Sequence, residues 1–124
     1  MFVPLSNDRL AEIYKEIVHP NGLVITQLLS RLRNKPYAEK IYAVTSMGKL
    51  FFTTASSYDD CRKNKQYGFL IEEKIDANKT LITMSYHENG RRKPSAEHQC
   101  TLEEAVEYID LYVMRMLLEK YGEL

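Results

Sequence analysis

The stretch Lys40–Thr54, KIYAVTSMGKLFFTT, contains two runs of β-forming residues on either side of Met47-Gly48. Ile, Tyr, Val, Phe and Thr dominate both runs, and these residue types favour a pleated strand. Glycine supplies the positive φ that a two-residue hairpin turn requires. The stretch therefore predicts a β-hairpin with strands over 40–46 and 49–54, and with it a fold built on antiparallel pairing.

A second hairpin is predicted further along the chain. Tyr67–Ile75 and Thr80–His87 are rich in strand formers and flank the polar residues 76–79, Asp-Ala-Asn-Lys, which we expect to form the connection. Side chains of a strand alternate between two faces. The more apolar set of the second strand is expected to face a helix: Ile82, Met84 and Tyr86. Residues 97–100 predict a short additional strand at the edge.

Two helices are predicted before the first hairpin. Over residues 6–18, apolar side chains recur at the spacing i, i+3, i+4 and i+7 of one helix face, and Ser6 or Asn7 can cap the start. Residues 23–32 carry three Leu at helical spacing, but their first four residues, Leu-Val-Ile-Thr, also suit a strand. We favour a helix here and keep the strand as the alternative.

The strongest helix pattern begins after Cys100. Thr101-Leu102-Glu103-Glu104 forms a capping box, in which Thr101 and Glu104 satisfy each other's backbone N–H groups. An apolar stripe follows: Leu102, Ala105, Val106, Ile109, Val113, Met116 and Leu117. Gly122 is the expected end of the helix.

Together these elements predict one α+β domain over residues 1–124. The expected architecture is an antiparallel sheet of four to five strands, built from two hairpins, with two N-terminal helices and a long C-terminal helix packed on one face. The 124 residues fit a single domain and bury enough surface to fold without a disulfide or a metal.

Charge is segregated along the chain although the formal net charge is zero. Residues 31–93 contain 13 basic and 7 acidic side chains, a net charge of +6, whereas residues 94–124 contain 2 basic and 7 acidic side chains, a net charge of −5. The N-terminal residues Met1–Leu5 lack the basic and apolar regions of a secretory signal. We therefore expect a cytoplasmic location, free thiols at Cys61 and Cys100, and no membrane span, since no apolar run reaches about 20 residues.

The sequence contains no recognisable catalytic or metal-binding pattern. His98 and Cys100 are two residues apart but form no recognisable nucleophile motif, so we expect Cys100 to pack at the helix start and His98 to face solvent. Structural zinc sites pair their ligands at short spacings that this sequence lacks. Phosphate-binding loops, dinucleotide fingerprints and nucleophile elbows are not found. We expect no enzyme activity, no cofactor and no metal.

Binding is the remaining class of function. Basic side chains cluster at residues 62–65 and 91–93, and the chain has nine Tyr and no Trp. Tyr and Arg are favoured anchors of protein interfaces. We expect a non-enzymatic protein-binding module, such as a small stoichiometric inhibitor or an immunity-type protein, with a homodimer left open. The expected contact residues are Tyr58, Arg62, Lys63, Tyr86, Arg91, Arg92 and Lys93.

The same basic loops keep a second interpretation open. Clustered Arg and Lys attract phosphate groups, and exposed aromatic rings stack on bases. RNA or single-stranded DNA binding through residues 62–65 and 91–93 is therefore the alternative. The zero net charge and the lack of a known RNA-binding motif count against it.

Overall fold

A computed structural model describes residues 2–18, 23–46, 49–57, 59–60, 68–88 and 93–121. Six strands, two short helices and one long helix have their bounds in these ranges. The strands are β1 (Phe2–Pro4), β2 (Tyr42–Ser46), β3 (Lys49–Thr53), β4 (Gly68–Asp76), β5 (Lys79–His87) and β6 (Ala96–Cys100). The helices are α1 (Leu10–Val18), α2 (Leu23–Leu32) and α4 (Leu102–Tyr121).

The six strands form one sheet in the order β1–β2–β3–β4–β5–β6, with every neighbouring pair antiparallel. The predicted α+β class and both hairpins are confirmed, as is the short edge strand before the C-terminal helix. The strand count is higher than the expected four to five because β1 was missed. Only three residues long and ending in Pro4, β1 has too little alternation to be recognised, and its conformation depends on pairing with β2.

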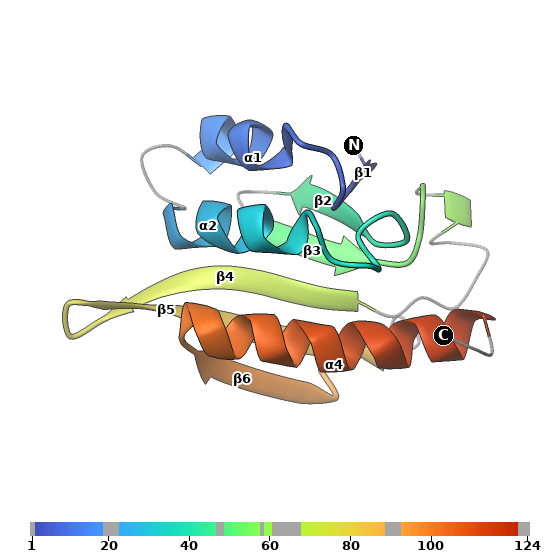
Figure 1. The fold of residues 1–124 in the computed structure, drawn as a ribbon. Coiled ribbons are helices and arrows are strands. Elements are labelled where there is room, and N and C mark those ends of the chain that lie inside the picture. The colour runs from blue at the N-terminus through green and yellow to red at the C-terminus, as the bar shows by residue number, and fades with distance from the viewer. Residues whose placement is uncertain are drawn as a thin grey trace.

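All three helices lie on one side of the sheet, as predicted (Figure 1). α2 and α4 contact each other and the central strands, whereas α1 packs against α2. The core between the layers includes the alternating set expected from the sequence, since Ile82, Met84 and Tyr86 are each at most 1% exposed. The other face of the sheet carries no helix among the described residues.

Local capping explains where the helices begin. Asn7 Oδ1 accepts a hydrogen bond of 2.9 Å from the Arg9 N–H in the turn before α1, which begins at Leu10 rather than at residue 6. At α4 the capping box forms as predicted: Thr101 N–H donates to Glu104 Oε1 (3.1 Å), and Glu104 N–H donates to Thr101 Oγ1 (3.3 Å). The expected end at Gly122 lies outside the described residues.

Residues 23–32 form a helix, so the strand alternative is wrong there. Burial of Ile25, Leu28, Leu29 and Leu32 gives the physical reason. These four side chains share one helix face and point into the core, an arrangement that a strand would split between two faces. The helical period therefore outweighs the β-branched residues at the start of the segment.

The connection between β4 and β5 is shorter than the four-residue loop expected from the sequence. Pairing continues to Asp76 opposite Lys79, so only Ala77 and Asn78 remain in the turn. Both have positive φ, 48° for Ala77 and 68° for Asn78, as the most compact hairpin turn demands. The prediction failed because Ala77 has no preference for that conformation. The Met47-Gly48 turn lies outside the described residues.

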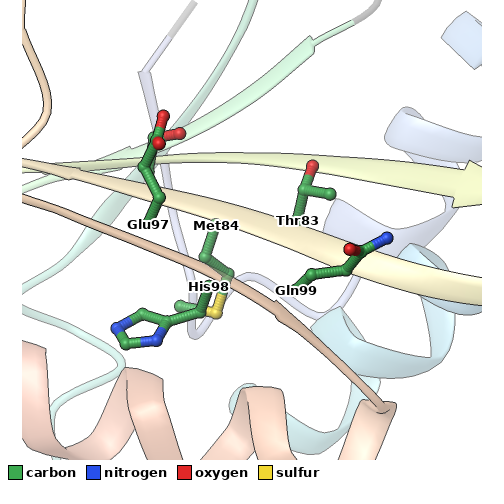
Figure 2. A pocket seen from close by; sticks show the side chains of 6 residues that line it. Thr83, Met84, Glu97, His98 and Gln99 are labelled. Atoms are coloured by element: carbon green, nitrogen blue, oxygen red, sulfur yellow. The ribbon is translucent and has the colours of Figure 1, made fainter.

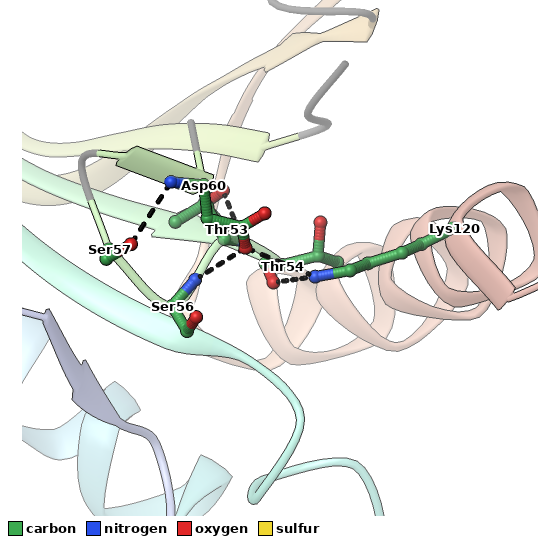
Figure 3. Close-up of polar contacts among 7 residues, drawn as sticks. Thr53, Thr54, Ser56, Ser57, Asp60 and Lys120 are labelled. Atoms are coloured by element: carbon green, nitrogen blue, oxygen red, sulfur yellow. Dashed lines mark hydrogen bonds and ion pairs between the residues drawn. The ribbon is translucent and has the colours of Figure 1, made fainter. Parts of the chain in front are cut away.

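A polar cluster ties the segment after β3 to the end of α4 (Figure 3). Lys120 Nζ donates to the Thr54 carbonyl oxygen (2.5 Å) and lies 3.6 Å from Asp60 Oδ2. Asp60 Oδ2 also accepts from the Ser56 N–H (3.0 Å), while the Asp60 N–H donates to Ser57 Oγ (3.1 Å). These contacts hold Thr54 and Asp60 against the end of α4 by both charge and hydrogen bonding.

Candidate functional site

The outer face of α4 exposes a row of large apolar side chains. Leu111 is 66% exposed, Met114 49% and Leu118 50%. They follow one another at i, i+3 and i+7, so they lie on one stripe of the helix. Elsewhere in the described residues, large apolar side chains are exposed only singly, at Leu23 and at Ile75. We name Leu111, Met114 and Leu118 the outer stripe.

The outer stripe lies opposite the buried face of the same helix. Ala105, Ile109, Val113 and Met116 are fully buried, and Leu117 is 7% exposed. At 100° per residue, these side chains centre on the side of α4 roughly opposite Leu111 and Leu118. α4 therefore has one apolar face that packs on the sheet and a second whose large side chains stay about half to two thirds exposed.

The sequence pattern predicted the buried stripe of α4 but not the outer one. The signal that could have revealed the outer stripe is a second set of apolar residues at i, i+3 and i+7, outside the predicted core stripe. A helix that is apolar on two faces is either buried on both or exposes one. The sequence cannot choose between these cases, because the choice depends on whether another layer covers the helix.

Acidic groups border the N-terminal half of the outer stripe. Glu104 and Glu107 are exposed, and they precede Leu111 by seven and four residues, so they lie on the same side of α4. The two cations of α4 are engaged within the chain: Arg115 forms an ion pair with Glu88, and Lys120 with Asp60. The rim of the outer stripe is therefore acidic.

Aromatic side chains brace α4 from β6 and β5. His98 stacks on Tyr108 with ring centroids 4.0 Å apart, and His98 Nε2 shares a hydrogen bond of 2.5 Å with Tyr112 Oη. Tyr112 in turn stacks on Tyr86 at 4.5 Å. The expectation that His98 faces solvent is thus wrong, because the alternation of β6 turns its ring toward α4. Burial is the main cause that raises the pKa of Tyr112.

A second polar anchor holds the middle of α4. Tyr37 Oη donates to Asp110 Oδ1 (2.6 Å), and Lys35 Nζ donates to Asp110 Oδ2 (3.0 Å). Burial and the neighbouring Asp110 carboxylate raise the pKa of Tyr37 far above its usual range. The outer stripe therefore rests on a helix fixed along its length, at Tyr112, Asp110 and Lys120, which suits a preformed binding surface.

The structure describes two of the seven contact residues expected from the sequence. Lys93 is exposed. Tyr86 is 1% exposed and lies in the core, with the Arg115 guanidinium 5.9 Å from its ring centroid, so its ring does not reach the surface. Tyr58, Arg62, Lys63, Arg91 and Arg92 lie outside the described residues, as do His19 and Cys61, and the basic loops remain a prediction.

A shallow depression of about 330 Å³ lies over β5 and β6. Figure 2 shows Thr83, Glu97 and Gln99 on one side of the two strands and Met84 and His98 on the other. Thr83, Glu97 and Gln99 lie on the face of the sheet that carries no helix among the described residues. The depression on that face therefore has no facing wall of the kind that encloses a ligand in a binding cleft.

Catalytic groups are not brought together in the described part of the chain. Cys100 is a buried free thiol, as expected, and burial with a contribution from Glu104 raises its pKa to about 11, which disfavours the reactive thiolate. Glu72 and Glu73 serve different partners on opposite faces of β4, Lys49 and the Ile25 N–H respectively. Within the described ranges no three His, Cys, Asp or Glu side chains gather as metal ligands.

Comparison of the chain with family models, with curated proteins and with solved structures finds no match. In the described ranges, each helix is too short or too polar to cross a membrane. Within the described ranges, the outer stripe of α4 is the one row of exposed large apolar side chains, and it is the candidate site.

Proposed function

We propose that this chain is a non-enzymatic protein-binding module whose contact surface is the outer face of α4. A small stoichiometric inhibitor or an immunity-type protein is the form of this function that suits its size. One observation carries the proposal: Leu111, Met114 and Leu118 expose large apolar side chains in a single row. Apolar side chains gathered in a row, rather than scattered, are typical of interaction surfaces.

The arrangement of α4 supports this function. Exposed Leu and Met side chains contribute nothing to the core, and their replacement by polar residues costs the folded state little. Aromatic stacking at Tyr112 and the ion pair at Lys120 hold the helix in place. A fixed surface loses little conformational entropy when a partner binds.

Affinity capture with matched variants tests the proposal. The full chain is immobilised as wild type, as the variant Leu111→Ser/Leu118→Ser, and as the control Ile75→Ser, which removes an even more exposed apolar side chain from the β4–β5 hairpin. Native lysate is applied with and without nuclease, and bound protein is quantified by mass spectrometry. Circular dichroism and urea unfolding confirm that both variants fold.

We expect one stoichiometric protein that survives nuclease treatment and is retained by wild type and Ile75→Ser but not by Leu111→Ser/Leu118→Ser. Retention by all three proteins would contradict the assignment of the outer face. Material that disappears with nuclease would favour the alternative, in which residues 62–65 and 91–93 bind nucleic acid. That alternative also predicts steep loss of affinity with salt.

A further inference from the structure

The geometry of the outer stripe points to the shape of its occupant. Leu111 to Leu118 spans seven residues, about 10 Å along the helix axis. A row of that length and spacing is matched by the apolar face of another helix, which presents side chains at i, i+3 or i+4 and i+7. An extended strand would instead place its side chains at a period of two and seek an edge of the sheet.

The charges around the stripe determine the chemistry of that helix. Glu104 and Glu107 are exposed beside its N-terminal end. Arg115 and Lys120 are already paired with Glu88 and Asp60. A partner that brings acidic groups to this rim meets repulsion, and one that brings Lys or Arg gains attraction and a faster encounter.

From these two observations we propose that the outer face of α4 binds a basic amphipathic helix of another protein, packed antiparallel to α4. This inference rests on the proposed protein-binding function and specifies its partner. In the antiparallel arrangement, the C-terminal half of the partner helix lies beside Glu104 and Glu107. Lys and Arg are favoured in that half of the partner helix by the negative end of the partner's own helix dipole, as well as by the acidic rim of the outer stripe.

Two other occupants fit the surface less well. A second copy of the chain brings the same α4 and the same exposed Glu104 and Glu107. Its α4 cations are also engaged with Glu88 and Asp60. A membrane surface is disfavoured because helices that lie on anionic lipid carry Lys and Arg beside their apolar face, whereas this rim carries Glu.

Designed peptides provide the probe. A helical peptide of about 20 residues carries Leu at i, i+4 and i+7, with Lys four and seven residues after the last Leu. A second peptide replaces those two Lys by Glu, and a third replaces the three Leu by Ser. Fluorescence anisotropy measures the dissociation constant of each for the full chain at low and at physiological salt.

Four variants of the chain complete the design. Glu107→Lys reverses one rim charge, and Glu97→Lys makes the same change on the opposite side of the molecule, on β6. Leu111→Ser removes one stripe side chain, and Ile75→Ser is its control. Sedimentation velocity of the wild type and flotation with anionic lipid vesicles test the two other occupants directly.

We expect the basic peptide to bind wild type at least tenfold more tightly than the acidic peptide, and the peptide without Leu not to bind. Glu107→Lys should remove most of the tenfold preference and Leu111→Ser should weaken binding about tenfold, while both control variants behave as wild type.

A Leu-dependent interaction that ignores peptide charge would overturn the basic partner but leave the protein-binding function intact. Self-association or vesicle binding that Leu111→Ser abolishes would assign the stripe to another occupant. Binding that is unchanged in Leu111→Ser would contradict both the partner and the surface.

Discussion

The carboxylate of Glu73, on β4, accepts a hydrogen bond of 2.7 Å from the backbone N–H of Ile25, in the first turn of α2. The first N–H groups of a helix have no partner within the helix and carry its positive dipole end. A strand residue 48 positions away thus accepts from one of these N–H groups. This bond fixes α2 on the sheet.

Removal of this cap should destabilise the protein. Glu73→Gln keeps an acceptor but loses the charge, so we expect the free energy of unfolding in urea to fall by about 1 kcal/mol, and by more for Glu73→Ala. Glu72→Gln is the control, because Glu72 pairs with the exposed Lys49 and surface ion pairs contribute little. Equal losses for the two Gln variants would contradict the capping role.

Replacement of Ala77 by glycine should stabilise the protein, although glycine usually destabilises a fold. Its φ of 48° is a conformation that costs an L-residue about 1 kcal/mol and costs glycine almost nothing. Ala77→Gly should therefore raise the free energy of unfolding by about 0.5 kcal/mol or more, even though glycine is more flexible in the unfolded chain. The same substitution at Ala96, in β6, should destabilise. A loss at position 77 comparable to that at position 96 would show that the turn is not strained.

Gly68 should tolerate no side chain. A Cβ at this position would lie 2.5 Å from Phe51 Cζ and 2.6 Å from the Phe52 carbonyl oxygen. The Phe51 ring can move, but the backbone oxygen belongs to the paired strand. Gly68→Ala should lower the free energy of unfolding by about 1–3 kcal/mol.

A second substitution separates the two contacts of Gly68. Addition of Phe51→Leu to Gly68→Ala should recover only part of the loss, since the clash with Phe52 remains. Full recovery in thermal or urea unfolding would assign the whole effect to the ring.

Alkaline pH should destabilise the protein in a defined window. Burial, then the charges of Glu73 and Glu72, raise the pKa of Tyr14 to about 12, against an ordinary value near 10. Between these two pKa values, Tyr14 therefore keeps its hydroxyl proton in the folded state and loses it in the unfolded state. This contribution to stability is complete below about pH 10 and is lost as pH rises through about 12.

Tyr14→Phe tests the assignment, because phenylalanine does not titrate. In the wild type, titration of Tyr14 should make the free energy of unfolding fall between pH 10 and 12 with a slope that corresponds to about one proton. In Tyr14→Phe, measured from pH 9 to 12, this contribution to the slope should be absent. Cys100 has a pKa raised to about 11, so its titration also lowers the free energy of unfolding from about pH 9 upward. This contribution is the same in the wild type and in Tyr14→Phe. An unchanged slope would mean that Tyr14 does not titrate in the window.

Much of the fold was predictable because its determinants are local. Both hairpins follow from alternation along strands, and the start of α4 follows from Thr101 and Glu104, three residues apart. β1 could not be predicted, since three residues become a strand only through pairing with β2. The turn at Ala77 and Asn78 was misjudged because strand pairing imposes positive φ on a residue that does not favour it.

The candidate site depended on tertiary structure more than the fold did. Tyr86 was expected at a surface, yet its ring is buried against Tyr112. His98 was expected in solvent, yet it stacks on Tyr108. For Tyr86, the alternation of β5 had already predicted a face turned toward a helix, so its choice as a contact residue conflicted with that prediction. For His98, the strand pattern did not show that its ring would meet Tyr108 and Tyr112 of α4.

Local sequence patterns are enough to specify the α+β class, the antiparallel hairpins and the amphipathic face that packs α4 on the sheet. These features rest on periodicity, capping and turn chemistry, which act between residues close in the chain. The exposure of Leu111, Met114 and Leu118 and the bond from Ile25 to Glu73 follow instead from how the layers pack. Exposure and long-range hydrogen bonding depend on which layers meet, and that is set by the packing of the whole domain.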